Sequence, residues 1–87
     1  MIKEYETFTE KVSWSVEDKK TIWNKANHIT GYEPNKWRRD KYGNEMKWED
    51  YGNKKSKYGW EISQVNLISN GIVNSIVNLH PLHWKNV

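Results

Sequence analysis

Aromatic side chains constrain the fold of this chain more than any other feature of its sequence. Six Trp, five Tyr and one Phe make up 14% of its 87 residues, and Cys is absent. One aromatic ring can bury about 150–250 Å², so we expect rings to supply much of the core of a single domain, residues 1–87. The absence of Cys excludes disulfides, thiolate zinc sites and a cysteine nucleophile.

Charge is unevenly distributed along the chain. Lys and Arg number 14 against 11 Asp and Glu, a net charge of +3. Residues 1–33 carry −1 and residues 34–58 carry +4, a mild basic excess that does not by itself indicate nucleic acid. No apolar run approaches the roughly 18 residues that cross a bilayer, and the first residues lack a signal-peptide core. We therefore expect a cytoplasmic protein with no membrane partner.

Local patterns predict one helix in the first third of the chain. Ser15 is a suitable N-cap, and acidic residues follow it in the first turn. Ile22, Ala26 and Ile29 recur at helical spacing, which predicts a helix over about residues 15–28.

The remainder is expected to be rich in β-strands. Met46 and Trp48 alternate with charged residues, as on a half-buried strand. Residues 60–64 (WEISQ) alternate in the same way, and residues 76–82 suggest a further short strand with Pro81 at its end.

Two strings in the last third, residues 58–62 (YGWEI) and 78–86 (NLHPLHWKN), are specific enough to suggest ancestry. Together with residues 37–40 (WRRD), they resemble the HNH endonuclease motif of the ββα-metal superfamily, over roughly residues 23–87. The resemblance implies an α+β fold in which a small antiparallel hairpin carries the site.

The same resemblance implies a division of the single domain into a helical part, residues 1–33, and an HNH-like β-rich part, residues 34–87. The final motif residue, on the helix that follows the hairpin in the family, falls on Val87, the last residue. We therefore expect a C-terminally truncated motif, in which the N-terminal helix and the Trp rings cover the apolar face of the hairpin.

The departures from the motif concern the residues that carry its chemistry. The family has an Asp that helps hold a divalent metal and a His that activates water, where this chain has Ser63 and Gln64. Asn78 keeps the central Asn, and Val87 offers no ligand side chain. The vestigial motif positions are thus Ser63, Gln64, Asn78 and Val87.

These replacements predict a catalytically inactive domain. The amide of Gln64 has no nitrogen that titrates near neutral pH, so it cannot take a proton from water, and loss of a general base typically costs a factor of about 10²–10⁴. The hydroxyl of Ser63 is a poor replacement for a carboxylate at a hard cation. We expect no catalytic residue, no metal and no cofactor, and hence a pseudoenzyme that binds.

A basic and aromatic set of side chains forms the candidate binding surface, because Trp, Tyr and Arg dominate binding hot spots. Its members are Trp37, Arg38, Arg39, Lys54, Lys55, Lys57, Tyr58, Trp60 and Trp84.

Two classes of partner are compatible with this surface, and the weak net charge favours a protein. By analogy, a small degenerate nuclease domain resembles the inhibitors, anti-CRISPR proteins among them, that phages carry against bacterial defence nucleases. The alternatives are a non-cleaving nucleic-acid-binding protein and a residual metal-dependent nuclease. The oligomeric state, monomer or homodimer, stays open.

Two further questions stay open at this level. His80 and His83 are three residues apart on a strand, where such positions face opposite sides, so hydrogen-bonded or surface roles are favoured over a shared metal. Arg38 is suited to an internal pair with Asp40 or Glu61 as well as to a partner.

Overall fold

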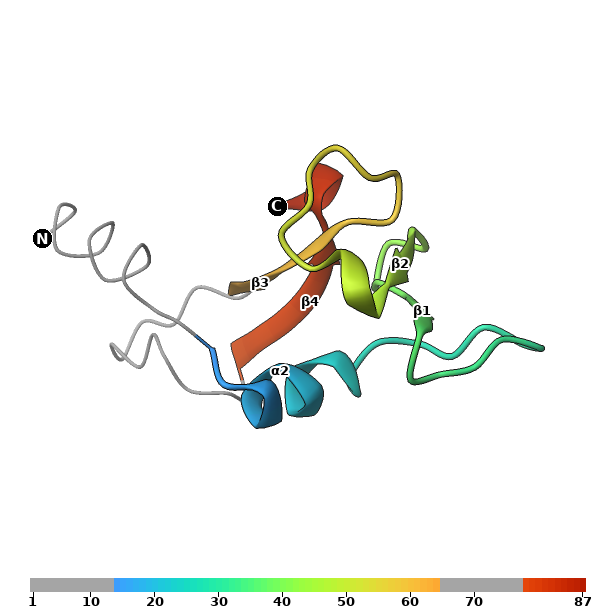
Figure 1. Ribbon diagram of the computed structural model, residues 1–87, viewed down its shortest axis with the longest axis horizontal. Helices are drawn as coiled ribbons and strands as arrows, with labels where there is room; N and C mark the ends of the chain where they lie inside the picture. Colours follow the sequence, from blue (N-terminus) through green and yellow to red (C-terminus); the bar gives the residue numbers. More distant parts are fainter. Residues whose placement is uncertain (1–13, 65–77) are drawn as a thin grey trace, which may run out of the picture.

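The computed structural model describes residues 14–64 and 78–87, and within them it shows one α-helix and two small antiparallel sheets (Figure 1). The expected α+β class is confirmed at this level. The amino-terminal residues and the start of the strand expected at 76 lie outside the described part. In chain order the elements are α2 (Val16–Trp23), β1 (Trp37–Arg39), β2 (Glu45–Lys47), the 3₁₀ turn η1 (Trp48–Asp50), β3 (Trp60–Gln64), β4 (Leu79–His83) and the 3₁₀ turn η3 (Trp84–Asn86).

The helix begins where the sequence predicts and ends earlier. The Oγ of Ser15 accepts a 3.0 Å hydrogen bond from the backbone N–H of Asp18, so the N-cap is confirmed. The expected extension to residue 28 is wrong, because Asn27 exchanges two 2.9 Å backbone hydrogen bonds with Arg39 at the end of β1. Pairing with a strand thus overrides the helical periodicity of the sequence.

The side chain of Arg38 explains how the chain leaves the helix. Its Nη1 donates to the carbonyl oxygens of Asn24 and Ala26, both at 3.1 Å, and its Nε donates to the carbonyl of Pro34 at 2.9 Å. The carbonyls of Asn24 and Ala26 lie just past the helix C-terminus, where intrahelical donors run out. Arg38 therefore uses carbonyl oxygens rather than the carboxylates of Asp40 or Glu61.

The hairpin β3–β4 carries two of the vestigial positions, Ser63 and Gln64, and a third, Asn78, immediately precedes β4. Trp60 pairs with His83 at one end and Gln64 with Leu79 at the other, so the strand predicted over residues 60–64 is confirmed. The expectation that Pro81 ends the second strand is wrong, since it lies in the middle of β4 opposite Ile62.

Proline is tolerated at position 81 because its nitrogen lies on the edge of β4 that faces away from β3. Two residues along, the backbone N–H of His83 points away from β3 and donates to Oδ2 of Asp40 at 2.9 Å. Alternate residues of a strand direct their N–H groups to the same side. The missing N–H of Pro81 therefore removes no hydrogen bond between the strands.

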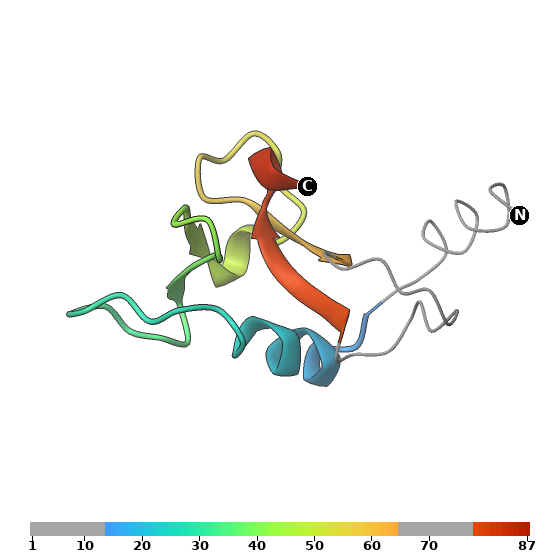
Figure 2. The same cartoon turned by 180° about the vertical axis from the view of Figure 1, so that it is seen from behind.

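An aromatic cluster forms the core, as the composition predicts. Trp23 of α2 lies 4.9 Å from Trp60 of β3 and 5.5 Å from Trp48 of η1, measured between ring centroids, and Tyr51 packs at 4.9 Å from Trp60. Trp23, Trp60 and Met46 have no exposed surface. In both views α2 lies alongside β4, so the helix covers the hairpin (Figures 1 and 2).

Candidate functional site

The motif positions of the hairpin gather where Gln64 pairs with Leu79, away from η3, at the end where residues 65–77 link the two strands (Figure 1). We call this end the open end because a hollow opens beside it. Ser63 pairs with His80 across the two strands, Gln64 pairs with Leu79, and Asn78 immediately precedes β4. All of these polar side chains are partly buried. Val87 follows η3 at the other end of β4, so it lies apart from the other vestigial positions.

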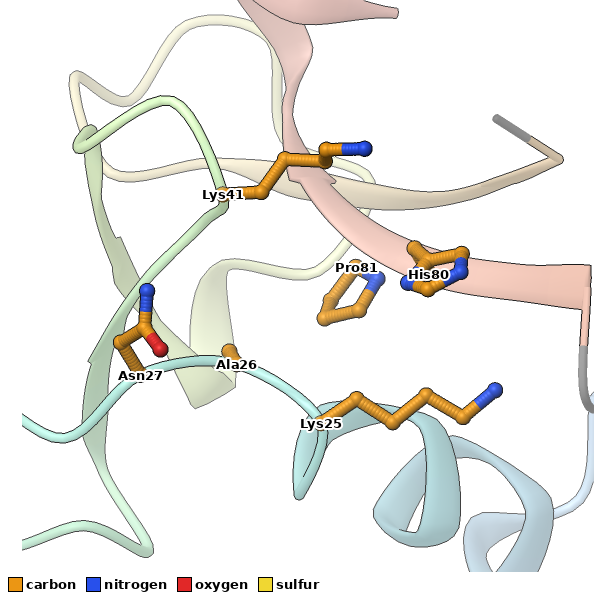
Figure 3. Close-up of a pocket in the computed structure, with 6 residues that line it drawn as sticks. All are labelled: Lys25, Ala26, Asn27, Lys41, His80 and Pro81. Carbon is orange, nitrogen blue, oxygen red and sulfur yellow. The ribbon is translucent and has the colours of Figure 1, made fainter. Parts of the chain in front are cut away.

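A hollow of about 80 Å³ opens beside His80. Its lining comes from three segments: Lys25 and its neighbours after α2, Lys41 in the turn after β1, and His80 and Pro81 on β4 (Figure 3). The imidazole of His80 lies between the ends of the two lysine side chains (Figure 3). The Nζ of Lys25 donates a 2.8 Å hydrogen bond to the carbonyl of Leu79, which anchors that ammonium beside β4.

Burial and nearby charge both act on the groups of this hollow. Burial is the main cause that lowers the pKa of His80, and the positive charges of Lys25 and Lys41 lower it further. Burial also lowers the pKa of Lys25. The hollow is therefore electropositive around a neutral imidazole at neutral pH.

We call the opposite end of the hairpin, where Trp60 pairs with His83, the closed end because its polar groups are buried. It is organised around a fully buried carboxylate, Asp40. Its Oδ1 accepts from the backbone N–H groups of Tyr42 (3.0 Å) and Asn44 (2.9 Å), which closes the turn between β1 and β2. Its Oδ2 accepts from the N–H of His83 (2.9 Å) and from Nδ2 of Asn86 (2.7 Å). Asp40 thus joins the first sheet to β4 and η3.

His83 has a structural role in the same region. Its ring is 2% exposed, Nε2 donates to the carbonyl of Lys57 at 2.7 Å, and Nδ1 accepts from the N–H of Lys85 at 3.0 Å. These partners require the neutral tautomer with its proton on Nε2. His80 and His83 therefore have separate surroundings on β4.

Of the candidate binding residues, three (Trp37, Lys57 and Tyr58) contribute to a contiguous surface of rings and cations. Trp37 contacts Tyr32 and Tyr58 edge-on, at centroid distances of 5.7 and 4.9 Å. The ammonium of Lys47 lies 5.4 Å from the Trp37 ring, and that of Lys57 lies 5.8 Å from the Tyr58 ring. We call these five residues, Tyr32, Trp37, Lys47, Lys57 and Tyr58, the aromatic–lysine face.

The other candidates divide into buried, paired and exposed side chains. Arg38 is 6% exposed and Trp60 is fully buried, so neither is available to a partner. Arg39 is paired with Glu45 at 3.3 Å, and the indole N–H of Trp84 donates to the carbonyl of Ser56 at 2.7 Å. Lys54 and Lys55 are exposed on the loop before β3.

Sequence reasoning missed Lys25, Asn27 and Lys41, which line the hollow, and the junction role of Asp40. For Asp40 a local signal existed, because Asp followed by Gly and Asn within four residues is typical of a turn that the carboxylate closes. For the lysines no local signal exists, since only the tertiary fold brings their segments to His80.

Among residues 14–64 and 78–87, no group of three or more His, Asp or Glu side chains is arranged to hold a metal ion. In that same part of the chain, no helix has the length and apolar character to cross a membrane. Comparisons with protein-family models, curated proteins and solved structures find no match for this chain.

Proposed function

We propose that this chain is a non-enzymatic binding protein whose aromatic–lysine face recognises an acidic surface of another protein. The observation that carries the proposal is the packing of Tyr32, Trp37 and Tyr58 into one row of rings with Lys47 and Lys57 over them. Tyr32 is 48% exposed, and the other two rings are partly exposed. Rings held rigidly at a surface supply contact area at a low cost in conformational entropy.

The charge of the face supports an acidic partner. Lys57 is exposed, and Lys47 is partly exposed with an ion pair to Glu49 at 3.2 Å. Four of the five residues of the face, all except Tyr32, belong to residues 34–58, the segment that carries the chain's basic excess. Complementary charge on a partner would accelerate association and select against basic surfaces.

The arrangement of the rings favours a protein over single-stranded nucleic acid. A base stacks on an open ring face, whereas Trp37 packs against two tyrosine rings and has an ammonium of the chain over it. A net charge of +3 over the whole chain is also small for a surface that must neutralise many phosphates.

The open end of the hairpin supports a non-enzymatic role. Neither the hydroxyl of Ser63 nor the amide of Gln64 can act as a general base near neutral pH. Among the described residues, His80, opposite Ser63, is a titratable group at this end. The resemblance to nucleases then suggests a regulator or inhibitor of a nuclease, for example one of bacterial defence, as the kind of protein partner.

A matched charge-reversal experiment tests the proposal. Tagged wild-type protein, Lys57→Glu and Lys85→Glu are used as baits in a bacterial lysate, and captured proteins are identified and their affinities measured with purified partner. Lys85 is exposed in η3, outside the aromatic–lysine face, and so gives the same charge change elsewhere. We expect an acidic partner that binds wild type and Lys85→Glu equally and Lys57→Glu at least about tenfold more weakly.

Two results would contradict the proposal. One is a partner whose affinity falls equally in both variants, because the face would then have no special role. The other is binding to mixed DNA or RNA that weakens steeply with salt in wild type and Lys57→Glu, which would identify nucleic acid as the ligand.

A further inference from the structure

The hollow beside His80 is a second feature that bears on binding, and it shares no residue with the aromatic–lysine face. Six of the described residues line it, and none of these six is a carboxylate: Lys25, Ala26, Asn27, Lys41, His80 and Pro81. We propose that this hollow is a binding site for a phosphate group.

The size of the hollow fits such a ligand. Its volume is about 80 Å³, enough for several water molecules and therefore for one tetrahedral oxyanion with part of its ester group. An extended base or a peptide segment would not fit inside it. The site would hold one phosphate, and any larger molecule would lie outside the opening.

The charges of the hollow select an anion. Lys25 and Lys41 come from different segments of the chain, and in the close-up view the imidazole of His80 lies between the ends of their side chains (Figure 3). Burial is the main cause that lowers the pKa of His80, and the charges of Lys25 and Lys41 lower it further, so both ammonium groups lie near enough to His80 to act on it. Lysine ammonium groups are common ligands of phosphate, and the amide of Asn27 at the rim adds a further donor type.

Hydrogen bonds hold the segments that carry Lys25 and Lys41 in place. The hydrogen bond from Lys25 to the carbonyl of Leu79 anchors one ammonium at β4. The turn that carries Lys41 is closed by two hydrogen bonds to the buried Asp40. The elements that carry the cations are thus ordered before a ligand arrives, which lowers the entropic cost of binding.

NMR titration of His80 with small phosphates tests the proposal. The imidazole signals of His28, His80 and His83 are followed against pH, with and without inorganic phosphate, methyl phosphate or dimethyl phosphate at constant ionic strength. A bound anion favours the imidazolium form, so we expect added phosphate to raise the pKa of His80 specifically. Methyl phosphate and inorganic phosphate both acting would indicate a terminal phosphate group, and dimethyl phosphate acting as strongly would indicate a backbone phosphodiester.

A matched pair of lysine variants provides the control. Lys41→Gln removes one cation of the hollow from an exposed position, and Lys85→Gln removes an exposed cation elsewhere. We expect Lys41→Gln to weaken phosphate binding about tenfold or more, the usual scale for a charge-assisted hydrogen bond, and Lys85→Gln to leave it unchanged. An unshifted His80 at saturating phosphate, or equal weakening in both variants, would overturn the proposal. Neither outcome depends on the aromatic–lysine face.

Discussion

The two ends of the β3–β4 hairpin differ in what their polar groups do. At the closed end, where Trp60 pairs with His83, a buried carboxylate and a buried imidazole are fully engaged with named partners. At the open end, where Ser63 pairs with His80, polar side chains lie partly exposed beside an electropositive hollow. From this difference we expect the buried carboxylate of Asp40 to contribute more to stability than the partly exposed hydroxyl of Ser63.

Removing the buried carboxylate gives the largest expected effect. Asp40→Ala leaves the N–H of His83 without its acceptor, leaves Nδ2 of Asn86 with Asn44 alone, and opens the turn after β1. We expect a loss of about 4 kcal/mol in the free energy of unfolding, from unsatisfied buried donors. Urea denaturation followed by Trp fluorescence measures it.

The matched change at the open end is Ser63→Ala, for which we expect a change within about 0.5 kcal/mol. If Asp40→Ala does not fold, Asp40→Asn, which keeps one oxygen acceptor, gives a measurable intermediate. Equal losses at the two ends would remove the distinction drawn between them.

A glycine at the closed end sharpens the same point. A Cβ on Gly59 would collide with the backbone carbonyl oxygen of Asn53 and lie 3.0 Å from Cδ1 of Trp84. Because a backbone atom cannot move aside cheaply, we expect Gly59→Ala to destabilise the protein by about 3 kcal/mol. Gly31→Ala meets no neighbouring atom but has φ +85°, so about 1 kcal/mol is expected there. If thermal or urea unfolding shows that Gly31→Ala destabilises the protein more than Gly59→Ala does, the loop before β3 packs differently.

The smallest expected effect is a pH dependence from the open end. The folded-state pKa of His80 lies below its ordinary value near 6.5, first through burial and then through Lys25 and Lys41. Below about pH 6.5 the unfolded chain therefore binds more protons at this residue than the folded chain. The contribution of His80 to the free energy of unfolding is fully present above that pH and is lost as the pH falls through the folded-state pKa.

Comparison of wild type with His80→Gln isolates this contribution. Urea unfolding between pH 8 and pH 5 should show a shallower decline for His80→Gln than for wild type. Parallel curves would mean that His80 has the same proton affinity in both states, and the electropositive character of the hollow would then be in doubt.

Local rules predicted the elements whose causes are local. The Oγ of Ser15 caps the helix, the strand at residues 60–64 forms, and Trp rings make the core. The family resemblance predicted a small antiparallel hairpin but not which of its residues pair, and the comparisons leave that resemblance itself a hypothesis.

What local rules missed depends on contacts between distant parts of the chain. The helix ends early because Asn27 pairs with Arg39, and Arg38 binds carbonyl oxygens that a local pattern cannot identify. Pro81 is accepted inside β4 because its edge faces away from β3. The hollow was missed for the same reason, since Lys25 and Lys41 meet His80 only in the folded chain.

We propose that the hairpin end with Ser63, Gln64 and Asn78 can bind a ligand but cannot activate water for hydrolysis. A cleavage assay on supercoiled plasmid DNA and mixed RNA with Mg²⁺ or Mn²⁺ tests this directly. We expect wild-type protein to cleave neither substrate above the level of the EDTA control. Nicking that EDTA abolishes, that Asn78→Ala removes and that Lys85→Gln retains would contradict it.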